Sequence, residues 1–349
     1  MKVRAAAVQA ETYYDEEWRN VDLCLKYIDE AGEKGVELLC FPEGYPGPYS
    51  GPMDFAGKVQ FDVLEAICDR AKKNRLFVTV CYLEENPEID GTFFLVQKLI
   101  SNRGEVLANY KRFQPDHQYL NAYLMGGRRH ILPGDEITVV ETEIGRIGLQ
   151  ICSELWVPEI SRIQMLKGAD IIVAPFGGHY KVTHFKDKQY TWHCIARARA
   201  AENIVYVIVA QSIYDLALEH QEISEGEAKT TLIIAGPEKT IATSPPKFGL
   251  VIADLDMDRL NHLRGSYYSE ELLSTPKDLN NYVSCATRPG QCHDRRPQDY
   301  GALVAPQPDA FDYHYHRRGL DAWKENFEKV AEFQNSDRTE TPQPTTSKV

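Results

Sequence analysis

GLQICSELWVPE, at residues 148–159, predicts a strand that turns directly into a helix. Leu149 and Ile151 alternate with small or polar residues, which is the period of a strand. Pro158 suits the first turn of a helix, where its missing N–H group loses no hydrogen bond. We therefore expect Cys152 at the carboxyl end of a strand, in the tight connection before a helix.

A cysteine in that position has two interpretations. Ligands of α/β sheets gather at the carboxyl ends of the strands, and backbone N–H groups there can hold a developing oxyanion. Cys152 is therefore a candidate nucleophile. Cysteine is also among the residue types most often buried, so a structural role is the other interpretation. A carboxylate and a cation at the same edge of the sheet would favour the nucleophile.

Length and composition limit the function classes. The chain has 349 residues, 43% of them hydrophobic, which is enough for a large core and for one to three domains. Its net charge of -12 argues against nucleic acid and anionic membranes as partners. We expect no signal peptide and no membrane-spanning segment, because no apolar run is long enough. The eight cysteines are scattered, which is typical of a reduced, cytoplasmic protein.

The first 41 residues predict a β-α-β unit, with strands at 3–8 and 36–41 and an amphipathic helix at 15–35. Such a unit implies parallel strands and a right-handed crossover. Residues 204–210 are almost continuously apolar, as expected for a strand in a sheet that is covered on both faces. The fold class is therefore α/β.

Glu43 follows the second apolar strand, at the edge expected for Cys152. It could be an exposed turn residue. We favour a site residue, because a carboxylate beside a buried run needs a specific partner.

Lys111 ends another apolar strand, whereas most lysines of the chain are expected to be solvated surface charges. It precedes an insertion at residues 114–132 that is rich in His, Tyr and Arg and is too long for a plain connector. Arg128 and Arg129 in this insertion could bind a substrate carboxylate or lie at a surface or subunit contact.

The chain changes character after about residue 263. We expect one domain at residues 1–263, an arm at 264–333 that packs on another subunit, and a disordered tail at 334–349. A homodimer or larger homo-oligomer would cover the aromatic residues of the arm. The arm also contains a set of Cys and His residues whose spacing fits no zinc signature: Cys285, Cys292, His293, His314 and His316.

Three motifs in this order resemble the carbon–nitrogen hydrolase (nitrilase) superfamily. They are FPEG at residues 41–44, YKR at 110–112 and ICSELWVPE at 151–159, with support from PG at 133–134 and ARARAAEN at 196–203. The resemblance covers roughly residues 1–262. It implies an α-β-β-α sandwich, here with a C-terminal extension.

The resemblance also implies a Glu-Lys-Cys triad made of Glu43, Lys111 and Cys152. Cys152 would attack the substrate carbon and form a thioester, and Glu43 would move the protons. Lys111 would stabilise the tetrahedral oxyanion together with the backbone N–H of Ser153. This chemistry needs no metal and no organic cofactor.

The sequence departs from many amidases of the superfamily, which have a further glutamate a few residues after the lysine. Residues 114–121 contain none, and Asp116, His117 and Tyr119 are the candidates to replace it. Glu154 also stands where an aspartate is common. Further candidates for holding the substrate or the oxyanion are Tyr49, His117, Tyr119, Ser153, Glu154, Trp156, Phe176 and Gly177.

The leading functional prediction is a hydrolase of a small carboxamide or N-carbamoyl amine that releases ammonia. A nitrilase is the alternative enzyme, and the missing glutamate keeps it open. A catalytically silent scaffold or binding protein is the alternative of another class. Retention of all three expected triad residues argues against a scaffold.

Overall fold

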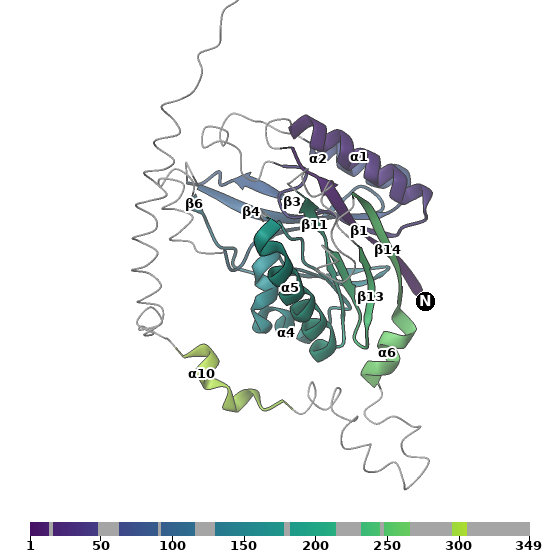
Figure 1. Ribbon diagram of the computed structural model, residues 1–349. Helices are drawn as coiled ribbons and strands as arrows, with labels where there is room; N and C mark the ends of the chain where they lie inside the picture. The colour runs from purple at the N-terminus through teal and green to yellow at the C-terminus, as the bar shows by residue number, and fades with distance from the viewer. Residues whose placement is uncertain are drawn as a thin grey trace, which may run out of the picture.

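The structure is a computed structural model that describes residues 1–13, 17–47, 63–89, 92–115, 130–177, 182–213, 232–244, 248–265 and 295–305. Two β-sheets lie face to face in the middle of the molecule, and helices cover their outer faces (Figure 1). The layers are thus helix, sheet, sheet, helix. This arrangement confirms the predicted α-β-β-α sandwich.

The first sheet has the strand order β11-β1-β2-β3-β4-β5, with β14 beside β1 and β6 beside β4. Its parallel part consists of β11, β1, β2 and β3, whereas β4 and β5 continue it antiparallel. Strand β5 therefore runs in the same direction as β2 and β3. The strands are β1 (Lys2–Glu11), β2 (Leu38–Cys40), β3 (Phe77–Glu85), β4 (Thr92–Ile100), β5 (Val106–Lys111), β6 (His130–Ile131), β11 (Gln211–Ile213) and β14 (Gly249–Asp256).

The second sheet has the order β13-β12-β10-β9-β8-β7. Strands β8, β9 and β10 are parallel, and the remaining pairs are antiparallel. The strands are β7 (Val139–Thr142), β8 (Gly145–Leu149), β9 (Ile171–Val173), β10 (Tyr206–Val209), β12 (Leu232–Ala235) and β13 (Thr240–Ser244).

Helices α1 (Glu17–Glu33) and α2 (Leu64–Asn74) pack on the first sheet, and α4 (Pro158–Leu166) and α5 (Val182–Asn203) pack on the second (Figure 1). The amphipathic helix predicted at 15–35 corresponds to α1. Helix α6 (Met257–Gly265) follows β14, and a 3-10 turn η4 (Pro297–Asp299) and α10 (Gly301–Val304) lie further along the chain.

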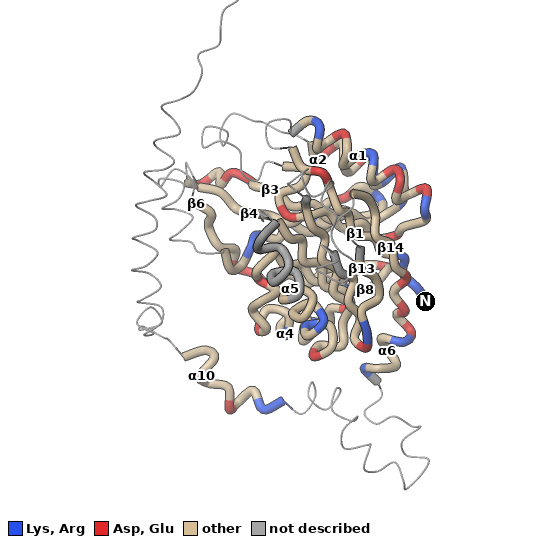
Figure 2. Tube along the Cα trace, in the orientation of Figure 1, with Lys and Arg blue, Asp and Glu red and all other residues tan. Residues whose placement is uncertain are grey.

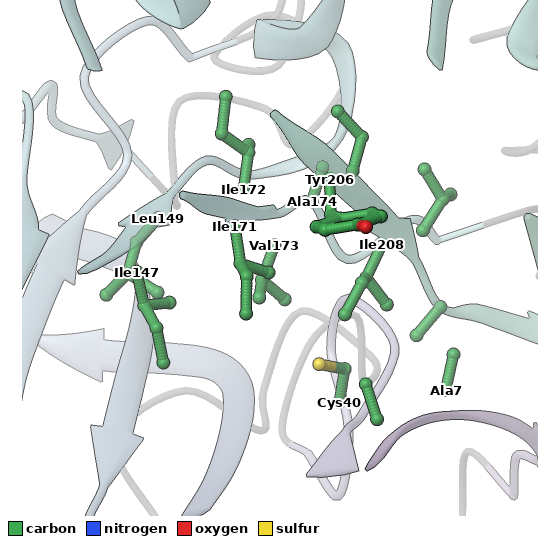
Figure 3. Close-up of a cluster of buried hydrophobic side chains, with 14 of the residues drawn as sticks. Ala7, Cys40, Ile147, Leu149, Ile171, Ile172, Val173, Ala174, Tyr206 and Ile208 are labelled. Carbon is green, nitrogen blue, oxygen red and sulfur yellow. The ribbon is translucent and has the colours of Figure 1, made fainter. Parts of the chain in front are cut away.

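The alternation of side chains along each strand produces two separate cores. Ala6 and Val8 of β1 face the helices α1 and α2, whereas Ala5 and Ala7 face the second sheet. Figure 3 shows the inner core, where Ile171 of the second sheet points toward Cys40 of the first and Ile172 points away from it. Charged residues lie mainly on the outer helices and at strand ends (Figure 2).

The C-terminal part of the chain is described in two pieces. Helix α6 crosses the expected domain boundary at residue 263, and Arg264 binds the body of the molecule through the carbonyl oxygens of Ala169 and Ile204. Most of the expected arm, including its Cys and His residues, lies outside the described residues. No helix in the described ranges is both long and apolar enough to cross a membrane.

Candidate active site

Cys152 lies where the sequence predicted, after β8 and at the start of the 3-10 turn η1 (Cys152–Trp156) that leads into α4. Its φ angle is 53°, a left-handed conformation that a residue other than glycine adopts at an energetic cost. The Cys152 N–H donates to the carbonyl of Pro175 at 2.8 Å, so the neighbouring strand end holds this conformation. The thiol is thus presented on a strained turn between the sheets, with the residue 8% exposed.

Glu154 stabilises the turn at Cys152. Its carboxylate is fully buried and accepts hydrogen bonds from the Ile151 N–H at 2.6 Å and the Gln114 N–H at 2.8 Å. The Tyr110 hydroxyl donates to the same carboxylate at 2.8 Å. Burial is the main influence on the carboxyl group and raises the pKa of Glu154. Glu154 was a candidate for binding the substrate. Its hydrogen bonds instead connect the turn at Cys152 to the end of β5.

Glu43 follows β2, at the carboxyl end of its strand as predicted, but β2 belongs to the first sheet and β8 to the second, so the expected common edge with Cys152 is wrong. Glu43 is 1% exposed, and its Oε2 accepts a hydrogen bond from the Gly177 N–H at 2.7 Å. A Cβ atom at Gly177 would lie 2.8 Å from the same oxygen, so a larger residue would displace the Glu43 carboxylate. Gly177 therefore contributes to the site by holding the Glu43 carboxylate with its backbone.

Arg112, which the sequence analysis did not select, supplies the cation next to Glu43. Its Nη1 lies 3.4 Å from Glu43 Oε1, and its Nη2 donates to Ser153 Oγ at 2.6 Å. The Arg112 residue is 4% exposed, so this is a buried ion pair. One guanidinium thus joins the carboxylate of the first sheet to the residue that follows Cys152.

Lys111 points the other way, and its expected place beside Cys152 and Glu43 is wrong. It pairs with Val96 of β4, and its Nζ lies 3.9 Å from the ring centroid of Phe94. Phe94 pairs with Glu84 of β3, and Asn109 also reaches Glu84 on this face. Neighbouring residues of a strand face opposite sides, so Tyr110 and Arg112 point between the sheets whereas Lys111 points outward.

The backbone around Arg112 is fixed from two directions. The Arg112 N–H donates to the Leu95 carbonyl at 2.8 Å, and the Arg112 carbonyl accepts from the Gly134 N–H at 2.8 Å. A Cβ atom at Gly134 would lie 2.4 Å from the Lys111 carbonyl oxygen. The PG motif at residues 133–134 therefore packs directly against the end of β5 and fixes the direction of the Arg112 side chain.

Aromatic side chains adjoin the nucleophile turn. The rings of Phe176 and Trp192 have centroids 4.2 Å apart, and Trp156 packs edge-on against Trp192 at 5.7 Å. Trp156 is 48% exposed, whereas Phe176 is buried. Arg199 of α5 donates to the carbonyls of Leu155 and Trp156 at 2.9 and 3.1 Å. The ARARAAEN motif at residues 196–203 therefore contacts the ICSELWVPE motif at 151–159 directly.

The other expected site residues are not all described. Tyr49, Asp116, His117, Tyr119, Arg128 and Arg129 lie outside the described residues. Within the described ranges, no three His, Cys, Asp or Glu side chains are grouped so that they could hold a metal ion. The six cysteines of these ranges form no disulfide there.

A family model for carbon–nitrogen hydrolases matches residues 4–264. The chain belongs to the carbon–nitrogen hydrolase family. It is accordingly a hydrolase of carbon–nitrogen bonds other than peptide bonds.

Relatives in this family include proteins described as amidases and as nitrilases. The chain is 23% identical over 248 residues to omega-amidase NIT2 of Xenopus tropicalis, covering 70% of this chain and 86% of the relative. It is 24% identical over 319 residues to an aliphatic nitrilase of Rhodococcus rhodochrous, covering 81% of each. The crystal structure of a carbon–nitrogen hydrolase from Helicobacter pylori G27 has a TM-score of 0.67 at 20% identity, covering 87% of this chain and 99% of that one.

Proposed function

We propose that this carbon–nitrogen hydrolase cleaves a small carboxamide or N-carbamoyl amine through a thioester on Cys152 and releases ammonia. The observation that carries the proposal is the strained turn at Cys152, whose φ is 53°, opposite the buried Glu43 carboxylate. A strained nucleophile turn and a buried base on facing strand ends are the two parts that attack on an amide needs.

The first half of the proposed reaction forms the thioester. Glu43 takes the thiol proton, the sulfur of Cys152 bonds to the carbonyl carbon, and the π electron pair moves to the oxygen. The backbone N–H of Ser153 is our candidate donor to this oxyanion. When the oxyanion collapses, the C–N bond breaks and Glu43 returns its proton to the leaving nitrogen.

The second half releases the acid. Glu43 takes a proton from water, and the hydroxide oxygen bonds to the thioester carbon. The C–S bond then breaks and the sulfur of Cys152 recovers a proton, so the net reaction consumes one water molecule. We also expect the reaction to take place in the cytoplasm, an expectation supported by the scattered cysteines.

A nitrile is the alternative substrate. The match to the aliphatic nitrilase covers 81% of this chain, whereas the match to the omega-amidase covers 70%. Attack of the same thiol on a nitrile carbon would give a thioimidate, and water would convert it to a thioester and ammonia. Both substrates therefore end in a carboxylic acid.

The test is ammonia release from a panel of small amides, ureido acids and nitriles, combined with mass spectrometry of the Cys152 peptide. We expect one class to react, with an acyl adduct on Cys152, and no turnover by Cys152→Ala. Cys194→Ala is the matched control, because Cys194 is exposed on α5 and should leave the rate unchanged. Hydrolysis by Cys152→Ala would refute the proposal, and a native protein that neither hydrolyses nor acylates would favour the scaffold alternative.

A further inference from the structure

The buried positive charge next to Glu43 is the guanidinium of Arg112. Its role in the reaction rests on the proposed function. We propose that Arg112 is the positioning residue of the reaction, holding the Glu43 carboxylate and the Ser153 hydroxyl with its two terminal nitrogens. Arg112 thus supplies the positive charge next to Glu43 that the motif order suggested for Lys111, but it acts on Glu43 and Ser153.

The contacts of Arg112 divide between the two halves of the site. Nη1 lies 3.4 Å from Glu43 Oε1, and Nη2 lies 2.6 Å from Ser153 Oγ. Glu43 belongs to the edge of the first sheet, and Ser153 follows the nucleophile in the second. Arg112 therefore fixes the base relative to the thiol across the space between the sheets.

The fork shape of the side chain suits this task. A guanidinium presents several N–H groups in one rigid plane, so it binds two oxygens in defined directions, whereas an ammonium is a compact point charge. The Ser153 oxygen accepts the bond from Nη2, so its own O–H must donate in another direction. Arg112 thereby orients both Glu43 and the Ser153 hydroxyl.

The charge of this cation is permanent. A guanidinium does not lose its proton in a folded protein, whereas an ammonium does so at alkaline pH. Arg112 binds the Glu43 carboxylate and the Ser153 hydroxyl. Its charge also acts to lower the pKa of the Glu154 carboxyl, the Tyr110 hydroxyl and the Cys81 thiol, in each case against the larger effect of burial. The native enzyme should therefore lose no activity at alkaline pH through loss of its cation.

The experiment compares Arg112→Gln and Arg112→Lys with Lys111→Gln, a matched control one residue away on the opposite face. The first measurement needs no substrate: the rate of Cys152 alkylation by iodoacetamide at neutral pH. Loss of the charge that holds Glu43 and the Ser153 hydroxyl should slow Arg112→Gln by about tenfold or more. Lys111→Gln should stay within about twofold of the native rate, because its side chain packs on Phe94.

The second measurement is the pH dependence of kcat on the reactive substrate. Arg112→Lys should keep part of the native rate near neutral pH and lose it at alkaline pH as the ammonium is deprotonated, a decline that the native enzyme should not show. A purely structural role would lower stability without adding this decline. The second variant retains a positive charge, so it tests the inference even if Arg112→Gln does not fold.

Two results would overturn the inference. One is an Arg112→Gln protein that is folded and alkylates within twofold of the native rate. The other is an Arg112→Lys protein whose pH profile superposes on the native one. Neither result affects the proposed function, which fails separately if Cys152→Ala hydrolyses the substrate.

Discussion

Replacing Glu154 should disturb stability and catalysis together. Its buried carboxylate accepts from the N–H groups of Ile151 and Gln114 and from the Tyr110 hydroxyl. Ile151 leads into the nucleophile turn, and Gln114 lies two residues after Arg112. Glu154→Ala would leave all three donors without their acceptor in a buried place.

The expected magnitude follows from the orphaned donors. Each buried donor left unsatisfied costs about 1–3 kcal/mol, so the two buried donors, the Ile151 N–H and the Tyr110 hydroxyl, predict a loss of about 2–6 kcal/mol in the free energy of unfolding. Glu154→Gln keeps one acceptor oxygen, but its NH₂ group must face at least one backbone N–H. We expect a loss of about 1–3 kcal/mol for this variant.

The assay is urea unfolding at two pH values together with steady-state kinetics. Burial raises the pKa of Glu154, so the native chain takes up this proton at higher pH than the unfolded chain. The stability that Glu154 contributes therefore rises as the pH falls from the raised pKa of the folded protein toward the pKa of the unfolded chain. The difference in the free energy of unfolding between the native protein and Glu154→Gln should be larger at about pH 5 than at about pH 7. Displacement of the turn should lower kcat by about tenfold or more in both variants.

Glu159 provides the matched control, because it is an exposed glutamate in the first turn of α4. Glu159→Ala should change stability by no more than about 1 kcal/mol, the size of a charge effect at a helix end. The reasoning about Glu154 is refuted if Glu154→Ala unfolds within about 0.5 kcal/mol of the native protein, the range of an ordinary surface substitution.

Two further predictions concern Gly177 and the C-terminal arm. Gly177→Ala should lower kcat by about tenfold or more while leaving the protein folded, because its Cβ would lie 2.8 Å from Glu43 Oε2; native kcat would show that the carboxylate need not be held there. We expect the full-length chain to form a homo-oligomer and a chain ended after Gly265 to sediment as a smaller species, because Leu303 and Val304 of the arm are 64% and 84% exposed in the single chain and an oligomer would bury them; a monomeric full-length protein at micromolar concentration would contradict this.

The positions of Cys152 and Glu43 could be predicted because they depend on local patterns. Each follows a short apolar strand, so its place at the carboxyl end of that strand can be read from the sequence; the assignment of the two strands to facing sheets cannot. The sandwich follows in the same way from the alternation of strands and helices. Such patterns need no knowledge of long-range contacts.

The role of Arg112 was not predicted because the motif match to Lys111 was given more weight than the alternation of side chains along β5. Tyr110 is a large, mainly apolar side chain at the end of β5, so it should face the core, and Arg112 must then share its face. By the same reasoning, the side chains of Lys111 and Asn109 point away from the core. The role of Glu154 had no comparable signal, because its three donors come from two separate parts of the chain.

The anchoring of Gly134 has a consequence for how this enzyme can change. The chain leaves β5 after Arg112 and returns at Leu132 and Gly134, whose N–H groups bind the carbonyls of Phe93 and Arg112 at 2.8 Å each. The two ends of the segment between Arg112 and Leu132 are thus hydrogen-bonded to neighbouring positions of the first sheet. Doubling the length of such a segment costs only about 0.6 kcal/mol of free energy through loop-closure entropy. Insertions, deletions and exchanges between these two anchors can therefore change the sequence of this segment while the backbone of Arg112 keeps its place, so this stretch can evolve separately from Glu43 and Cys152.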